Sequence, residues 1–443
     1  MLVELSGDEN FLQDKLRSSW SREEKLDADP VRFELADTGR AELADTGKAE
    51  LADTSWPAVD PGSPGPPPVR LWTKPTLHRY RWQNPFGGDE MTLSAAATCR
   101  RHCADLSAAW TESGENAYGC IKQLFVLKKS NRGLKTLLSI GGWTFSANFA
   151  AVASTDAGRS TFATSSVVLM RDWGFDGIDI DWEYPKDAEE AESLALLLAA
   201  VRAKLDEYAS QHAPGYRFLL TMAAPAGKAH YEKLDLKRLS GLVDTFYLMG
   251  YDYAGPFASH AAHQANLYTN AAKSTTTPFS TNAAIAAYLE AGVPASQIVL
   301  GMPLFGRAFQ NTAGLGEPFC GVGRGSWDDG TMDDSGAWDY KALPQPGAAV
   351  MYDETAVASF SYDAEARALI SYDTPRTVKR KVAYITEKGL GGSMFWEASG
   401  DRTDGDSLIT TSFEALGACC LGEGQNYLEY PISRYGNIRR KLE

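Results

Sequence analysis

The chain has 443 residues, of which 44% are hydrophobic and 23% charged, which is enough for one large domain with an insertion or for two or three ordinary domains. Its formal net charge of -14 argues against a nucleic acid or an anionic membrane as a partner, because most of the surface would repel a polyanion. No apolar run reaches the length of a membrane span, so we expect a soluble protein with a neutral ligand.

The first 70 residues differ from the rest of the chain. They are polar and contain a tandem eight-residue repeat over Glu34–Pro57, followed by a stretch rich in Pro and Gly. Such sequence cannot bury enough apolar surface to offset chain entropy, so residues 1 to about 70 are predicted to be disordered. The amino terminus lacks a basic stretch followed by an apolar one, and therefore shows no signal peptide.

From about residue 118 the chain alternates short apolar strands with amphipathic helical segments, a pattern typical of parallel βαβ units. Six strands are predicted, at residues 134–143, 175–183, 217–226, 244–252, 298–307 and 391–397. No glycine-rich dinucleotide fingerprint follows the first of them, which favours a (β/α)8 TIM barrel over an open sheet. We assign residues 71–443 to this barrel.

One interval is too long for a single crossover. Roughly 85 residues separate the last two predicted strands, and they are rich in Tyr, Trp, Ser and turn residues. The sequence predicts a small α+β insertion subdomain here, at about residues 308–375. At the other end, residues 1–117 contain only a poor candidate for a first strand, VRLWTKPTLHRYRW, so the barrel is predicted to be missing or irregular in its first two strands.

Four acidic residues fall within eight positions of one apolar strand, at Asp176, Asp179, Asp181 and Glu183. Alternate residues of a strand share a face, so the last three are predicted to point together into the barrel, at a Cα spacing of roughly 6.5 to 7 Å. Carboxyl groups this close cannot all ionise freely, so one is expected to hold a proton near neutrality. Glu183 ends the strand, where barrel enzymes place catalytic groups.

Two other interpretations of this acidic row are a calcium loop and a solvated acidic face. A calcium loop would need Asp-x-Asp-x-Asp-Gly spacing with a distal Glu, which is absent from the strand. A solvated face would not alternate with Ile and Trp. The pattern therefore favours a catalytic site.

The run FDGIDIDWEYP resembles the Asp-x-x-Asp-x-Asp-x-Glu signature of family 18 glycoside hydrolases, the chitinases. LLSIGGW, LMGYDY, GMPLFGR and GGSMFWE resemble, in order, four further motifs of that family. Over about residues 118–443 the chain is similar to the fungal chitinases. The resemblance implies hydrolysis of chitin with retention of configuration and without an enzymic nucleophile.

In that mechanism Glu183 would protonate the glycosidic oxygen, while the 2-acetamido oxygen of the substrate attacks the anomeric carbon. Asp181 would orient the acetamide and stabilise its charge, and Asp179 would share a proton with Asp181. Tyr251 would hydrogen-bond the acetamido carbonyl, and Asp252 would help to hold the distorted sugar. The substrate-binding residues that the resemblance implies are Trp143, Tyr184, Met222, Met249, Arg307 and Trp396, although core packing explains Met222 and Met249 equally well.

The resemblance further implies a monomer without cofactor or metal that acts on chitin or chito-oligosaccharides, with no nucleic acid and no membrane as partner. It implies an extracellular location, whereas the lack of a visible signal peptide leaves a cytoplasmic one open. Phe305 departs from the family pattern, which has Tyr at this position of the seventh strand.

Three alternatives stay open: a non-catalytic chitin-binding lectin, an endo-acting N-acetylglucosaminidase, and a degenerate, inactive relative. Lectins of this type lose the acid, so the presence of Glu183 favours an enzyme.

Overall fold

The computed structural model describes residues 115–326, 335–417 and 424–442, together with the backbone of three short strands, β1 (Leu2–Val3), β2 (His78–Arg81) and β3 (Met91–Ala96). Apart from β1, the segment predicted to be disordered, residues 1 to about 70, lies outside the described residues.

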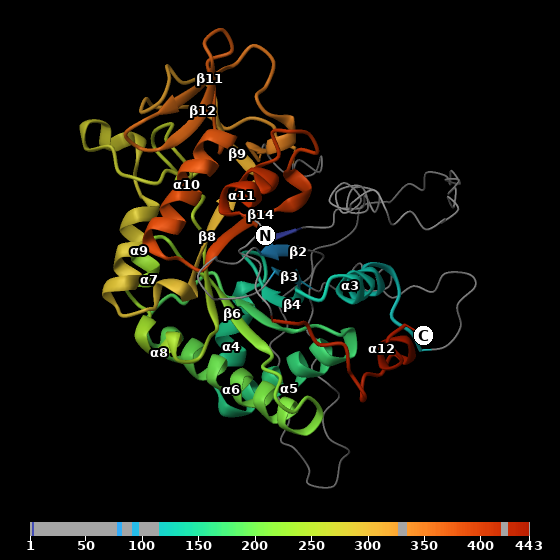
Figure 1. Cartoon of the computed structure of the whole chain (residues 1–443). Coiled ribbons are helices and arrows are strands. Elements are labelled where there is room, and N and C mark those ends of the chain that lie inside the picture. Colours follow the sequence, from blue (N-terminus) through green and yellow to red (C-terminus); the bar gives the residue numbers. More distant parts are fainter. Residues whose placement is uncertain are drawn as a thin grey trace, which may run out of the picture. The chain divides into compact units, whose positions relative to one another are not determined.

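The centre of the fold is a curved sheet of parallel strands (Figure 1). Its members are β4 (Leu134–Gly141), β5 (Gly177–Asp181), β6 (Leu219–Ala224), β7 (Thr245–Leu248), β8 (Ile298–Pro303) and β14 (Gly392–Trp396), and each pairs in parallel with the next. These strands coincide with the six predicted from the sequence, which confirms that prediction. Every residue of β5, β6, β7 and β8 is buried, as in sheets covered on both faces.

Two further strands connect the edges of this sheet. β3 pairs in parallel with β4, whereas β2 runs antiparallel to both β3 and β14. The pairing of β2 with β3 joins the ends of the nine-stranded order and leaves only β1 outside, so eight strands form the ring. The prediction that the first two strands are missing or irregular is therefore not confirmed: both positions hold strands, and β2 falls within the sequence judged a poor candidate.

Helices cover the outer face of the sheet (Figure 1). The longest, α5 (Asp156–Trp173) and α6 (Ala188–His212), pack against each other and against β4, β5 and β6. Thr155 and Asp187 cap their first turns by accepting hydrogen bonds from backbone N–H groups. The remaining helices are α3 (Gly119–Ser130), η1 (Ser146–Asn148), α4 (Phe149–Ala153), α7 (Lys228–Tyr231), α8 (Leu236–Ser240), η2 (Ala271–Thr276), α9 (Thr281–Glu290), η3 (Ala295–Gln297), η4 (Tyr340–Ala342), α10 (Pro375–Lys388), η5 (Ala398–Gly400), α11 (Leu408–Leu416) and α12 (Gly436–Arg439).

A second, antiparallel sheet fills the long interval between β8 and α10. Its strands are β9 (Phe305–Phe309), β10 (Ala337–Asp339), β11 (Ala349–Asp353), β12 (Ala358–Asp363) and β13 (Ala368–Ser371), in the order β10-β9-β13-β12-β11. Phe309, Phe360 and Leu369 form its apolar core with Ala254 and Ala261 from the loop after β7. The described part of this interval contains only the short η4 turn besides the strands, so the predicted α+β composition is not confirmed.

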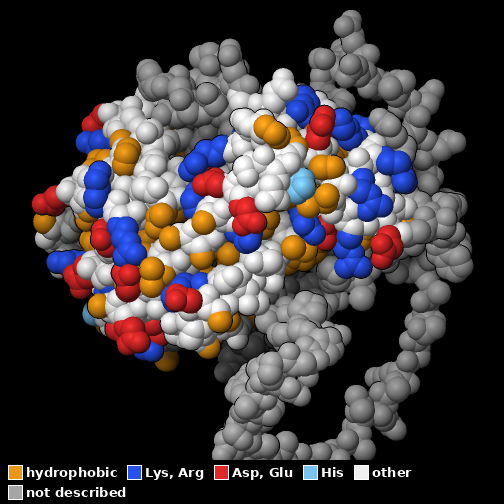
Figure 2. Space-filling model, turned by 90° about the horizontal axis from the view of Figure 1, so that it is seen from below, with side chains coloured by type: hydrophobic (Ala, Val, Ile, Leu, Met, Phe, Trp, Pro, Cys, Tyr) orange, Lys and Arg blue, Asp and Glu red, His pale blue; other side chains and the backbone are white. Residues whose placement is uncertain are grey.

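Positive charge collects where α3 meets the carboxyl-terminal segment. Lys129, Arg439, Arg440 and Lys441 lie there, and Figure 2 shows Lys and Arg side chains gathered on the side of the molecule that carries α3 and α12. The charge of this region is positive, whereas the formal net charge of the whole chain is -14. Within the described ranges, no helix is both long and apolar enough to cross a bilayer.

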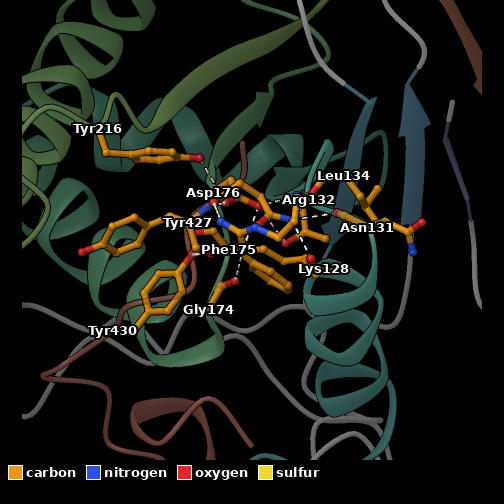
Figure 3. A network of polar contacts seen from close by, with 12 residues as sticks. Lys128, Asn131, Arg132, Leu134, Gly174, Phe175, Asp176, Tyr216, Tyr427 and Tyr430 are labelled. Carbon is orange, nitrogen blue, oxygen red and sulfur yellow. Dashed lines mark hydrogen bonds and ion pairs between the residues drawn. The ribbon is translucent and has the colours of Figure 1, made fainter. Parts of the chain in front are cut away.

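The carboxyl-terminal segment is tied to the sheet by a buried ion pair (Figure 3). Lys128 of α3 lies 2.8 Å from Asp176, just before β5, and both side chains are fully buried. The same ammonium group donates to the carbonyl of Gly174 at 2.6 Å and to the hydroxyl of Tyr430 at 3.0 Å. Asp176 also accepts from the backbone N–H of Tyr427 at 2.8 Å. Burial lowers the pKa of Lys128 to about 8, against the attraction of Asp176.

Replacing Lys128→Met should therefore destabilise the protein strongly. The substitution removes the cation while Asp176, the Gly174 carbonyl and the Tyr430 hydroxyl stay buried. Breaking a buried ion pair from one side costs about 3 to 5 kcal/mol, so we expect a loss of that size in the free energy of unfolding, measured by urea denaturation.

Lys204→Met provides the matched control, because Lys204 forms an exposed ion pair with Glu207 on α6. Its loss should cost less than about 1 kcal/mol. Equal losses for the two variants would contradict a structural role for the buried pair.

Candidate active site

The acidic row of β5 begins with a carboxylate that is fixed from both sides. Asp179 is fully buried, and it accepts hydrogen bonds from Ser139 Oγ of β4 at 2.7 Å and from Thr221 Oγ1 of β6 at 2.6 Å. Both partners lie directly beside Asp179 in the strand register. Alternation along β5 puts Asp181 on this inner face, and Ile178 on the outer one. Asp179 therefore lies inside the ring of strands, held by hydroxyl groups from both neighbouring strands.

A glycine pair lets the end of β4 pass close to Asp181. At Gly141, with φ of 123°, an added Cβ would lie 2.0 Å from the Asp181 carbonyl oxygen, so no other residue fits. Gly142 donates its N–H to the same oxygen at 2.8 Å. The loop that follows also supplies Ser146, whose Oγ accepts from the N–H of Glu183 at 2.7 Å. These contacts fix the backbone on which Asp181 and Glu183 stand.

Tyr184 connects the acids to the opposite wall of the site. Burial is the main cause that raises its pKa well above the usual value, and the charges of Glu183 and Asp181 raise it further. A side-chain hydrogen bond to Glu183 and the proximity of Tyr251 act in the same direction. The four side chains thus share one site.

An apolar cluster forms that wall. Tyr184 and Trp396 pack against buried residues that include Met249, Tyr251 and Phe305. The rings of Tyr251 and Phe305 meet edge to face, with centroids 5.9 Å apart. Within the described residues no cluster of His, Cys, Asp and Glu side chains has the arrangement of a metal site.

Asp252 and Arg307 form a bidentate ion pair. Arg307 Nε and Nη2 donate to the two carboxylate oxygens of Asp252 at 2.7 and 3.0 Å. Asp252 has a left-handed φ of 58°, and its N–H donates to Gln264 Oε1 at 3.1 Å. The guanidinium group lies 5.1 Å from the centre of the Phe305 ring, which links this pair to the wall beneath it.

Most of the residues selected from the sequence come together. Trp143 follows the glycine pair in the sequence and is 76% exposed. Met222 is the exception: it neighbours Ile180 and Phe246 in the register, one position beyond the inward-facing Thr221, and it is buried. The assignment of Met222 to the site is therefore corrected, because its side chain lies on the outer face of β6.

No sequence motif identified Ser139, Thr221 or Ser146 as part of the site. The first two lie on predicted strands, but only the strand register shows that their hydroxyls meet Asp179. Together these features leave Glu183 partly exposed at the end of a row whose first members are buried. A carboxyl group so placed can transfer a proton to a bound molecule.

Comparison with known proteins points to one family. Residues 92–401 match the model of the glycosyl hydrolases family 18. Chitinase 1 of Aphanocladium album is 53% identical over 334 residues, which cover 75% of this chain and 77% of that protein. Endochitinase 1 of Metarhizium robertsii is 54% identical with the same coverage. The solved chitinase ChiA74 from Bacillus thuringiensis superposes with a TM-score of 0.65 at 32% identity, covering 71% of this chain and 56% of that one.

The two hydroxyl bonds to Asp179 can be tested by removing them. Thr221→Val keeps the shape of the side chain but leaves the buried carboxylate without one donor, and Ser139→Ala removes the other. Hydrogen bonds to charged groups contribute about 1.5 to 3 kcal/mol each, so each variant should lose about that much free energy of unfolding in urea.

Thr221→Ser is the control for this pair of variants, since it retains the hydroxyl and should stay within about 1 kcal/mol of the parent. If the Thr221→Val and Thr221→Ser variants had the same free energy of unfolding, the hydrogen bond from residue 221 to Asp179 would not stabilise the protein.

Proposed function

Because the chain belongs to family 18 of the glycosyl hydrolases, we propose that it hydrolyses the β-1,4 bonds between the N-acetylglucosamine units of chitin, with retention of configuration and with the substrate's own acetamide as nucleophile. The observation that carries the proposal is the change in exposure along the acidic row. Asp179 is fully buried and held by two hydroxyl groups, whereas Glu183 is partly exposed. The names of the two similar fungal proteins support the choice of chitin.

In the first step Glu183 gives its proton to the glycosidic oxygen, which leaves with the electron pair of its bond to the anomeric carbon. The acetamido carbonyl oxygen forms a new bond to that carbon and gives a cyclic oxazolinium ion. Asp181 accepts a hydrogen bond from the acetamide N–H and stabilises the positive charge. Water then attacks the anomeric carbon and gives a proton to Glu183, while the bond between that carbon and the acetamido oxygen breaks and restores the acetamide.

Asp179 assists Asp181 in this step. Since two hydroxyls hold it in place, it stays near Asp181 and shares a proton with it when Asp181 points inward. Tyr251 donates a hydrogen bond to the acetamido carbonyl. Phe305, at a position where the family has a tyrosine, packs against the Tyr251 ring. Phe305 thus retains the packing and lacks the hydroxyl.

The other residues of the site bind the sugar chain. Trp396 forms the floor, with Tyr184 and Met249 beside it. Trp143 offers its exposed indole ring for stacking on a sugar. Asp252 and Arg307, already paired, contact the chain together.

We extend the proposal to the domain arrangement. Residues 71–443 form the catalytic (β/α)8 barrel, with an insertion subdomain at about 308–375. The enzyme is a monomer that acts outside the cell, where chitin lies.

Glu183→Gln tests the assignment of the acid. The amide keeps the shape and hydrogen bonds of the side chain but cannot transfer a proton, so turnover of a fluorogenic N-acetylglucosamine oligomer should fall by a factor of at least about 10² to 10⁴, with oligosaccharide affinity retained. Glu189→Gln makes the same chemical change at an exposed position in the first turn of α6 and should leave turnover unchanged. Substantial turnover by Glu183→Gln would overturn the assignment.

The participation of the acetamide gives a separate test. Fully deacetylated chitosan oligomers should be inert, because they lack the nucleophile. Acetylated oligomers should first release the β-anomer, which NMR detects within the first minutes. An α-anomer as the initial product would mean that water attacks directly and that the mechanism is wrong.

A further inference from the structure

A histidine outside the motifs of the sequence stacks on Tyr184. His230 belongs to α7, in the loop after β6, and its ring centroid lies 4.3 Å from that of Tyr184 with an interplanar angle of 31°. Tyr184 in turn is hydrogen-bonded to the side chain of Glu183. His230 is therefore two contacts away from the proposed acid.

The surroundings of His230 favour a neutral ring. Burial lowers its pKa, and the charge of Lys233 lowers it further. Across the stack it faces the Tyr184 phenol, with the Glu183 carboxyl beyond. Its Nδ1 atom is buried and has no hydrogen-bond partner among the described residues. The contact with the Tyr184 ring therefore helps to orient the imidazole.

We propose that His230 is a positioning residue for Glu183: its ring holds the Tyr184 ring in the orientation in which the phenol donates to the Glu183 carboxyl. The inference rests on the proposed function, in which Glu183 is the acid. Tyr184 packs against the apolar wall and against the His230 ring, and these two contacts together fix the position of its hydroxyl at the acid. A carboxylate that accepts such a bond is stabilised and has a lower pKa than one that does not.

The test is a double-mutant cycle with Tyr184→Phe and His230→Ala. Each single variant should lower kcat about three- to tenfold, in the range that an aromatic contact supports. Each should also move the alkaline limb of the kcat/KM profile to higher pH. Without the hydrogen bond from Tyr184 the Glu183 carboxylate is less stabilised, so its pKa rises. The double variant should match Tyr184→Phe alone, since His230 has nothing left to position. His230→Phe, which keeps a ring on Tyr184, should restore most of the kcat lost by His230→Ala.

His212→Ala is the matched control. His212 also pairs with a tyrosine, Tyr208, at a centroid distance of 5.1 Å, but it lies at the end of α6 and away from the acids. It should leave kcat and the pH profile unchanged. The thermal midpoint of His230→Ala should stay close to that of the parent, which shows that the lower rate is not caused by unfolding.

Two results would overturn the inference: parental kcat and pH profile in His230→Ala, or a double variant whose loss equals the product of the single losses. Glu183→Gln separates this failure from that of the proposed function. If Glu183→Gln is inactive and the cycle is multiplicative, only the role of His230 is wrong. If Glu183→Gln turns over substrate, the acid is elsewhere and both proposals fail.

Discussion

The site depends on the carboxylate of Asp179 and the two hydroxyls that hold it. Ser139, Asp179 and Thr221 stand side by side on β4, β5 and β6, and their hydrogen bonds join three parallel strands through side chains as well as through the backbone. A slip of one residue in either register would turn one hydroxyl outward and leave a buried carboxylate with one donor fewer. The register that satisfies Asp179 is therefore also the one that places Asp181 and Glu183.

The four acids of the strand divide into two groups with different tasks. Asp176 lies just before the strand, and it is neutralised by Lys128 and bonded to the carboxyl-terminal segment. Asp179 and the acids after it face the interior, where Asp179 accepts hydrogen bonds from two hydroxyl groups. One short sequence thus anchors the chain end at one edge of the barrel and builds the reactive site at the other.

The sequence predicted the parts of the fold that depend on local pattern. Apolar runs identified the six parallel strands, and alternation identified the inward-facing acids. β2 was missed because its four residues, HRYR, carry two arginines and no aliphatic side chain. Met222 was misplaced because the face of a strand depends on its register, which a single strand does not reveal. The pairing of Asp252 with Arg307 joins residues 55 positions apart, and no local pattern predicts such a contact.

The different tasks of Asp179 and Glu183 explain why the first is buried and the second is partly exposed. A carboxylate that only orients its neighbours can be buried and fixed by hydroxyls, because it never has to meet a substrate. A proton donor must be reachable, and its side chain must also be held in a fixed position. Glu183 meets both conditions: its backbone is fixed by Ser146, its side chain is bonded to Tyr184, and it remains partly exposed. Tyr184 is held by the apolar wall and by His230, so the environment of the acid depends on the segments that follow β5 and β7 together with α7.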